Sequence, residues 1–229
     1  MSNEGKRKAA YRATEFVTDG QVVGLGTGST AEFAIRALGD LVREGLHITG
    51  VPTSEAAADL ARSLGIPLAD LNHVHSVDIT IDGADEVDPS FNMIKGGGGA
   101  LTREKLVALS SLWRVYVVDE SKLVERLGQS WAVPVEVLPF AWTLSALQLK
   151  GLGCETKLRG DLQTPFVTDN GNYIVDCRFD SISDAPQLAS AIKQQPGVVE
   201  SGLFTGIADL LVIGHADRVE VRESPRVRQ

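Results

Sequence analysis

Residues 77–105 read VDITIDGADEVDPSFNMIKGGGGALTREK and combine a strand, a polar loop and a helix in that order. The apolar run Val77–Ile81 is typical of a buried strand. Carboxylates follow it directly in Asp82, Asp85 and Glu86, where a strand would leave its sheet. In open α/β sheets, ligands bind at the carboxyl ends of strands. We therefore predict a catalytic site in this stretch.

The second half of the stretch brings together Lys95, the four glycines Gly96–Gly99 and a helix that begins near Leu101. Consecutive glycines cost backbone entropy, so they indicate a close approach or unusual dihedral angles. Paired carboxylates suit proton transfer, and a lysine with glycine N–H groups suits stabilisation of an oxyanion. Proton abstraction next to a sugar carbonyl, through an enediolate, would use all of them.

The same acidic residues also have ordinary explanations. Asp82, Asp85, Glu86 and Asp88 could form a solvated acidic loop. Glu104 could pair with a neighbouring cation or take part in capping its helix.

A second motif, GLGTGST at residues 24–30, joins the short strand Gln21–Leu25 to another helix. A strand, a glycine-rich turn and a helix N-terminus together hold anions well, because free N–H groups and the helix dipole face the ligand. The motif is neither a dinucleotide fingerprint nor a P-loop, since Ser29 replaces a required glycine and no Gly-Lys-Ser/Thr follows. It predicts a site for one phosphate or a sugar, or else a tight turn in which the serine caps the helix.

Strands at 21–25, 48–52, 77–81 and 114–118 alternate with helices, which predicts βαβ units and a mostly parallel sheet. The strand at 114–118 ends at Asp119-Glu120-Ser121-Lys122, so Lys122 is a candidate cation for the same sheet edge or an exposed loop lysine.

From Trp131 the pattern changes to helices interleaved with antiparallel strands, including a hairpin signal at Asp169–Asn172. We predict a small α+β domain over residues 131–202. Residues 1–130 and 203–229 would then form the larger domain, since late strands could return to it.

Bulk properties exclude several classes of protein. The chain has 229 residues and a formal charge of −8, which argues against a nucleic-acid partner. No apolar run approaches the roughly 18 residues of a membrane span. The two cysteines, Cys154 and Cys177, lack the spacing of a metal site, and so do the four scattered histidines. The two cysteines could be buried apolar residues or a disulfide. We expect a cytoplasmic protein without metal or cofactor.

Three motifs in order, GLGTGST at 24–30, DGADE at 82–86 and KGGGGALTREK at 95–105, closely resemble ribose-5-phosphate isomerase type A. PVEV at 134–137 and VTDNGN at 167–172 resemble the same family, so the resemblance covers nearly the whole chain. It implies interconversion of D-ribose 5-phosphate and D-ribulose 5-phosphate, without metal or cofactor, in the non-oxidative pentose phosphate pathway. It also implies a Rossmann-like domain, a smaller ferredoxin-like domain, and a homodimer or homotetramer.

The resemblance also assigns roles by position. Glu104 would be the general base that moves a proton between C1 and C2, while Asp82, Asp85 and Lys95 would act in ring opening and on the oxygens at C1 and C2. Lys6 is a possible phosphate contact. Gly99 stands where some relatives carry alanine, a difference expected to matter little because both residues are small. The substrate-binding residues implied are Thr27, Gly28, Ser29, Thr30, Asp82, Gly83, Ala84, Asp85, Lys95, Gly96, Gly97, Gly98 and Lys122.

Two alternatives stay open. The fold is reused in sugar-phosphate sensors of transcription regulators, although such a protein would normally bring a DNA-binding domain and its site could lose the base. A different sugar-phosphate isomerase on the same scaffold is the other alternative.

Overall fold

In the computed structural model, which describes residues 3–225, the chain forms two compact units. Among the described residues, the first unit comprises 3–84, 103–122 and 207–225, and the second comprises 85–102 and 123–206. The predicted boundary at residue 131 does not coincide with this division, because 85–102, 123–130 and 203–206 belong to the second unit. The division into a larger domain of 1–130 plus 203–229 and a smaller one of 131–202 stays a prediction.

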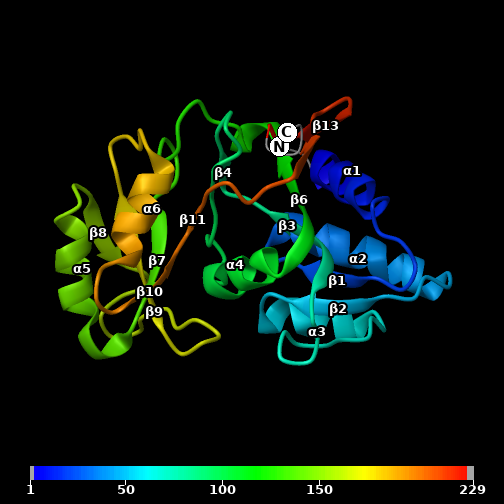
Figure 1. Ribbon diagram of the computed structural model, residues 1–229, viewed down its shortest axis with the longest axis horizontal. Coiled ribbons are helices and arrows are strands. Elements are labelled where there is room, and N and C mark those ends of the chain that lie inside the picture. Colours follow the sequence, from blue (N-terminus) through cyan, green and yellow to red (C-terminus); the bar gives the residue numbers. More distant parts are fainter. Residues whose placement is uncertain (1–2, 226–229) are drawn as a thin grey trace. The chain divides into compact units, whose positions relative to one another are not determined.

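The first unit is built on a six-stranded sheet with the order β13-β12-β6-β3-β1-β2 (Figure 1). Its strands are β1 (Val22–Leu25), β2 (Thr49–Pro52), β3 (Val77–Gly83), β6 (Ser111–Asp119), β12 (Leu210–Gly214) and β13 (Val219–Glu223). All neighbouring pairs are parallel except β12 and β13. The mostly parallel sheet predicted from alternating strands and helices is therefore confirmed.

Four helices accompany this sheet: α1 (Asn3–Thr14), α2 (Ser29–Arg43), α3 (Glu55–Ser63) and α4 (Leu101–Leu109), the last of which begins in the second unit. Ser54 starts α3, because its hydroxyl accepts a hydrogen bond from the Ala57 N–H at 3.1 Å. Ile79 and Ile81 of β3 lie in the core cluster that also contains residues of α1, α2 and α3. Burying each such side chain stabilises the fold by about 1.5–3 kcal/mol.

The opposite face of the sheet carries α4. Side chains alternate between faces along a strand. Val23 and Leu25 join the core cluster of α1 and α2, so Gly24 faces the other way. A Cβ at Gly24 would lie 2.7 Å from a methyl group of Val107 on α4 and 2.0 Å from the Thr80 hydroxyl. Glycine is therefore required where α4 crosses this face.

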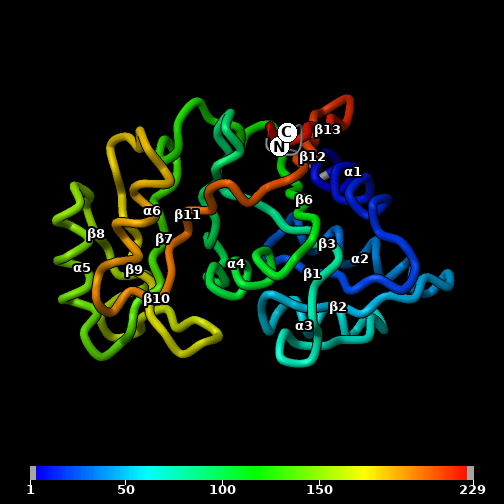
Figure 2. Tube along the Cα trace, viewed as in Figure 1, coloured from blue at the N-terminus to red at the C-terminus, as the bar shows by residue number. Residues whose placement is uncertain are grey.

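The second unit contains a four-stranded antiparallel sheet of order β10-β7-β9-β8 (Figure 2). Its elements follow one another as β7 (Val133–Val137), α5 (Trp142–Lys150), β8 (Glu155–Leu158), β9 (Tyr173–Arg178), α6 (Ala185–Lys193) and β10 (Val198–Ser201). This βαββαβ sequence of elements is the ferredoxin-like arrangement, which confirms the predicted fold of the smaller part.

A small three-stranded sheet completes the second unit, with β4 (Glu86–Val87), β5 (Met93–Ile94) and β11 (Leu203–Phe204) in the order β11-β5-β4. Two 3₁₀ helices, η1 (Glu120–Lys122) and η2 (Pro139–Ala141), lie in the first and second unit respectively. None of the helices within residues 3–225 is long and apolar enough to cross a membrane.

Candidate functional site

The order of the parallel strands points to one place on the first unit. Along the sheet the order is β2-β1-β3-β6-β12, so the direction in which successive strands are added reverses between β1 and β3. In open α/β sheets, ligands bind outside the carboxyl ends of the strands at such a reversal. The loop after β1 contains Thr27 and Gly28, and β3 ends with Asp82 and Gly83. GLGTGST and the start of DGADE therefore meet at this position.

Asp82 is fixed by backbone N–H groups from both loops. Its side chain is buried, and its Oδ1 accepts hydrogen bonds from Gly83 N at 2.7 Å and Thr27 N at 3.1 Å. A Cβ on Gly26 would lie 2.2 Å from that same oxygen. The second glycine of GLGTGST therefore gives the Asp82 carboxylate room to reach the loop.

The loop after β1 leads into the N-terminus of α2. Gly28 is the N-cap residue, with φ of 103°, and it has no side chain to cover the first turn. Ser29 therefore does not cap the helix, so the serine cap considered in the sequence analysis is wrong. Gly28 and Ser29 are exposed, and the Lys6 ammonium donates a hydrogen bond to the Ser29 hydroxyl at 3.2 Å. Exposed helix-start amides beside a lysine suit an anion.

The Thr27 side chain has a supporting task within the loop. Its hydroxyl contacts the Thr53 hydroxyl at 2.7 Å and the Ser54 hydroxyl at 2.8 Å. Thr53 in turn donates to the Leu25 carbonyl at 3.0 Å. This chain of hydroxyl groups ties the end of β1 to the start of α3 and orients the loop.

Glu104 is buried, with 4% of its surface exposed, and it lies in the first turn of α4. Val107, three residues later, contacts the sheet face of Gly24 and Thr80, and residues three apart share a helix face. Asp82 follows Thr80 by two residues on β3, so it projects to the same side. The Glu104 and Asp82 carboxylates are thus carried by the two elements that meet on this face.

Lys122 is half-buried and closes the 3₁₀ helix η1, which follows the carboxyl end of β6. Asp119 holds the turn, because its Oδ1 accepts hydrogen bonds from the N–H and the hydroxyl of Ser121. The lysine belongs to the same sheet edge as the loops after β1 and β3.

In the second unit, Asp85 and the glycine run are joined by direct contacts. The Gly97 N–H donates to Asp85 Oδ2 at 2.8 Å, and a Cβ on Gly97 would lie 2.8 Å from the carboxylate. Gly96 and Gly99 have φ values of 96° and 83°, which favour glycine. The run therefore has both features expected of it, a close approach and unusual dihedral angles.

Gly99 is less interchangeable with alanine than the sequence indicated. A Cβ there would lie 2.3 Å from the ring of Phe166, and the backbone φ is positive. In this chain the aromatic ring takes the space that an alanine methyl group would need.

Lys95 is held inside the second unit, with 2% of its surface exposed. Its backbone N–H donates to the Gly202 carbonyl at 2.9 Å, and its ammonium lies 5.5 Å from the centre of the Phe204 ring. An aromatic ring face attracts a cation at this distance. The segment 202–204, which includes β11, therefore contacts both the backbone and the ammonium of this lysine.

Arg159 supports the glycine run, a role that the sequence analysis did not predict. One guanidinium nitrogen donates to the carbonyls of Gly96 and Gly97 at 2.8 and 3.2 Å. Two others bind both oxygens of Asp176 at 3.0 and 2.6 Å. The fork geometry fixes the guanidinium and, through it, the loop. Arg159 lies more than 60 residues from the loop in sequence, so no local pattern announces the contact.

Glu136 explains two short motifs that accompany the main ones. The carboxylate of this PVEV residue is fully buried and accepts hydrogen bonds from Thr168, Asn170 and Asn172 of VTDNGN at 2.8–3.1 Å. It also accepts one from the Thr102 hydroxyl, at the start of α4. The two motifs thus form one polar network that anchors the residues next to the glycine run.

Glu86 and Asp88 both hold local structure, and the solvated-loop explanation is wrong for Glu86, which is buried. Glu86 is buried, and its carboxylate accepts hydrogen bonds from the N–H groups of Gly128, Ser130 and Trp131. Asp88 closes a local turn by accepting from Ser90 N at 2.8 Å and from Asn92 N at 2.9 Å. Of the clustered carboxylates, Asp82 and Asp85 are the ones that contact glycine-rich loops.

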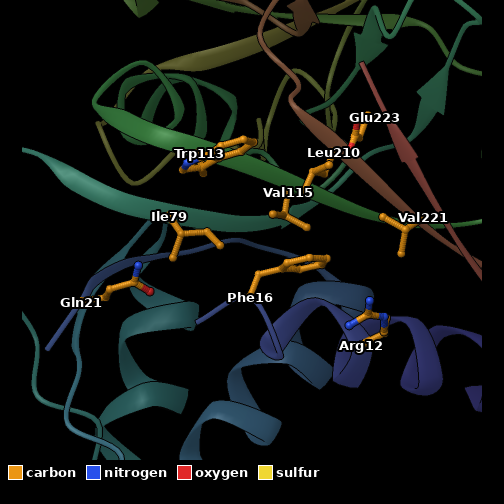
Figure 3. Close-up of a pocket in the computed structure, with 9 residues that line it drawn as sticks. All are labelled: Arg12, Phe16, Gln21, Ile79, Trp113, Val115, Leu210, Val221 and Glu223. Atoms are coloured by element: carbon orange, nitrogen blue, oxygen red, sulfur yellow. The ribbon is translucent and has the colours of Figure 1, made fainter. Parts of the chain in front are cut away.

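A groove of about 530 Å³ lies on the first unit (Figure 3). Arg12 of α1 and Phe16, just after that helix, line it together with Ile79, Val115 and Leu210, near the amino ends of the parallel strands. Ligands of open α/β sheets bind at the other end of the strands. The groove therefore gives no support to a catalytic role.

Within residues 3–225, no group of three or more His, Cys, Asp or Glu side chains has a metal-binding arrangement. Both cysteines are free and buried, so the disulfide left open by the sequence is not formed. A hydrogen bond with Cys154, together with burial, raises the pKa of the Cys177 thiol, which disfavours a reactive thiolate.

Comparison with known proteins gives one consistent result. The sequence profile of the family described as ribose 5-phosphate isomerase A (phosphoriboisomerase A) matches residues 49–218. Ribose-5-phosphate isomerase A of Ruegeria pomeroyi is 50% identical over 96% of this chain and 87% of its own length. The enzyme of Thermosynechococcus vestitus is also 50% identical, over 98% of this chain and 95% of its own.

Solved structures agree. Ribose 5-phosphate isomerase A from Methanocaldococcus jannaschii superimposes with a TM-score of 0.92 at 44% identity, covering 97% of this chain and all of that one. A D-ribose-5-phosphate isomerase in complex with phospho-erythronic acid gives a TM-score of 0.94 at 41% identity, with the same coverage of both chains.

Proposed function

Because this chain belongs to the ribose 5-phosphate isomerase A family, we propose that it uses Glu104 as the base of an aldose–ketose isomerisation. The protein is a ribose-5-phosphate isomerase and interconverts D-ribose 5-phosphate and D-ribulose 5-phosphate, a step of the pentose phosphate pathway. The observation that carries the assignment of roles is the reversal of strand order between β1 and β3, where the glycine-rich loop, Asp82 and the face of α4 converge.

The phosphate group is assigned to the N-terminus of α2. The amides of Ser29 and Thr30 begin the helix, and the helix dipole favours a dianion there. Lys6 contacts Ser29 and supplies one positive charge. Lys122, in the turn after β6, supplies a second, so two cations and two amides would offset the phosphate charge.

The sugar is assigned to the residues after β3 and to the glycine run. Asp82 and Asp85 move protons at the sugar oxygens during ring opening, and the backbone of Gly83 and Ala84 between them binds the sugar. The amides of the glycine run donate to the oxygens at C1 and C2. These donors are Gly96, Gly97 and Gly98.

The proton transfer itself needs one base and one source of positive charge. Glu104 removes the proton from C2 of the aldose and returns it to C1, while a proton passes from the oxygen on C2 to the oxygen on C1. Negative charge develops on these oxygens in the enediolate, and Lys95 stabilises it. Protein groups carry out every step, so the proposed reaction requires neither metal nor cofactor.

The related isomerase bound to phospho-erythronic acid supports the substrate class. That ligand combines a phosphate with a short hydroxylated acid, and this chain accordingly binds a sugar phosphate. Its acid group can be matched with the enediolate oxygens, which would place it beside the donors assigned to C1 and C2.

The test is turnover of D-ribose 5-phosphate by protein pretreated with EDTA, measured beside Glu104→Gln. The substitution keeps the size of the side chain and removes the base, so turnover is expected to fall by a factor of about 10²–10⁴. Glu125→Gln, at an exposed glutamate, is the matched control and is expected to keep full activity.

Normal turnover in Glu104→Gln would exclude Glu104 as the base. Loss of activity after EDTA, restored by a divalent metal, would contradict the metal-free reaction. A folded parent that binds the sugar phosphate without turning it over would favour the sensor alternative.

We further propose that the protein assembles as a homodimer or homotetramer and works in the cytoplasm. The family resemblance supports the assembly, and two free cysteines suit a reducing compartment. Light scattering coupled to size-exclusion chromatography measures the mass of the assembly. A mass of 24.5 kDa, that of one chain, would contradict the proposed oligomer. Cell fractionation measures the location.

A further inference from the structure

His215 lies at the carboxyl end of β12, the strand next to the edge strand β13 in the sheet of the first unit. It directly follows β12, whose last residue, Gly214, pairs in register with Asp119 at the end of β6. The imidazole is nearly buried, with 11% of the side chain exposed. Its backbone N–H donates to the Arg218 carbonyl at 2.9 Å, so the ring is held on a short turn.

Both ring nitrogens of His215 face carboxylates. Nδ1 lies 2.8 Å from Glu120 Oε2, and Nε2 lies 3.1 Å from Glu220 Oε2. Carboxylate oxygens only accept hydrogen bonds, and a neutral imidazole has a single N–H. Both contacts are therefore satisfied together only when the ring carries two protons and a positive charge.

The two carboxylates differ in their other partners. Glu220 of β13 also accepts from the guanidinium of Arg222, at 2.6 Å on one oxygen and 3.2 Å on the other. That second cation already balances its charge. Glu120 belongs to the 3₁₀ turn that ends at Lys122, so the imidazolium joins β12 directly to this turn.

Other charged groups lie around the turn of His215: Asp217 pairs with Arg218 at 3.5 Å, and Arg7 and Lys8 of α1 line a pocket together with these two residues. Hydrogen bonds with Glu120 and then Glu220 raise the pKa of His215, against smaller opposing effects of burial and of the Arg218 charge. On α1, Arg7 and Lys8 lie within 4 Å of Glu4. The carboxylates are the groups in direct contact with the ring, and they determine the direction of the shift.

The phosphate-binding loop is tied to the same cluster through α1. A Cβ on Gly5 would lie 3.2 Å from the His215 carbonyl oxygen, so the first turn of α1 packs directly on this residue. The next residue, Lys6, contacts Ser29 of the loop after β1. His215 therefore contacts the residue that precedes Lys6 and, through its ring, the 3₁₀ turn that ends at Lys122.

We propose that His215, protonated on both nitrogens, is a positioning residue that holds the Glu120–Lys122 turn in place and thereby sets the affinity for the sugar phosphate; this rests on the proposed role of Lys122. The imidazole does not touch the substrate. It acts through Glu120, the residue with which the turn begins.

The proposal gives the affinity a defined dependence on pH. The contacts raise the pKa of His215 above its usual value, so the positioning effect is fully present at low pH and is lost as the pH rises through the raised value. The substrate phosphate also titrates, near pH 6, but equally for parent and variant. The ratio of their KM values at each pH therefore isolates the contribution of His215.

The first experiment compares KM and kcat of the parent and of His215→Gln between pH 6 and 9. The variant is expected to raise KM about threefold at pH 6, with kcat within twofold, and the difference should vanish toward pH 9. His47→Gln is the matched control, because His47 pairs with Asp19 at 3.1 Å in an exposed position and is expected to leave KM unchanged. A KM ratio that stays the same at every pH, or that stays at one, would overturn the proposal.

The second experiment follows the histidine Cε1–H signals by NMR, with His215 assigned from its absence in His215→Gln. Its pKa is expected to lie above the usual value in the parent and to fall in Glu120→Gln; an unshifted pKa in the parent would overturn the proposal without reference to activity. Lys122→Ala separates the proposed phosphate role of Lys122 from the positioning role of His215. An unchanged KM in that variant would refute the assigned role of Lys122, and the positioning role would fall with it even if His215 titrates as expected.

Discussion

Replacing Glu86 by glutamine tests whether an acidic residue of the DGADE motif has a structural task. Its carboxylate is 1% exposed and accepts hydrogen bonds from three backbone N–H groups, with Gly128 on Oε2 and Ser130 and Trp131 on Oε1. Glutamine has one acceptor oxygen and one NH₂ group. Whichever way the amide is oriented, at least one N–H then faces another donor.

The magnitude follows from those contacts. Losing one charge-assisted hydrogen bond costs about 1.5–3 kcal/mol, and leaving a buried donor unsatisfied costs about 1–3 kcal/mol, with the two terms partly overlapping. We expect Glu86→Gln to lower the free energy of unfolding by about 2–4 kcal/mol. Turnover per folded molecule should change little, because Glu86 contacts the 128–131 loop instead of the glycine-rich loops.

Two measurements check this prediction. Urea unfolding followed by circular dichroism gives the stability, and amide hydrogen exchange over residues 128–131 gives the local effect, which matters because two compact units need not unfold together. The reasoning is refuted if stability falls by less than about 0.5 kcal/mol, the size of an ordinary surface substitution, and exchange at 128–131 stays unchanged.

Three further predictions concern the loops and the edge of the sheet. Lys122→Ala should raise KM for ribose 5-phosphate about tenfold with a smaller effect on kcat, measured by steady-state kinetics; an unchanged KM would refute its role with phosphate. Gly26→Ala places a methyl group 2.2 Å from Asp82 Oδ1, so it should cost about 1–3 kcal/mol of stability and lower turnover. Thermal unfolding and steady-state kinetics measure the two effects, and an alanine variant as stable and active as the parent would show that Asp82 can move without consequence. Hydrogen bonding with Arg222, then His215, lowers the pKa of Glu220 to about 2. The ionised Glu220 therefore stabilises the folded state above its ordinary pKa of 4.5, and this stabilisation is lost as the pH falls toward 2. Parallel acid unfolding curves for the parent and Glu220→Gln would contradict this.

The mostly parallel sheet and the carboxyl-edge position of the motifs follow from the sequence because they depend on local signals. Short, largely apolar segments that alternate with helices leave few alternatives to βαβ units. Glycines in GLGTGST and in the run Gly96–Gly99 mark positions where neighbours approach closely, whatever those neighbours are. These features require only knowledge of residues adjacent in the chain.

The supporting contacts were not predictable in the same way. Arg159 reaches the carbonyls of Gly96 and Gly97 from 63 and 62 residues away, and Glu86 receives its donors from 42 to 45 residues away. Local patterns contain no information on such pairs. An arginine or glutamate in a loop looks equally suited to solvent until the fold supplies the partner.

The sequence by itself determined the chemistry available to this protein: which carboxylates, lysines and glycine-rich loops exist, and that a strand or a helix presents each one. Tertiary structure alone decided how they are used. Asp82 and Asp85 contact the glycine-rich loops, Glu86 and Asp88 stabilise turns, and His215 joins two carboxylates at the edge of the sheet. The physical reason is that residue type fixes what a side chain can donate or accept, whereas burial and partners depend on segments that meet only in the folded chain.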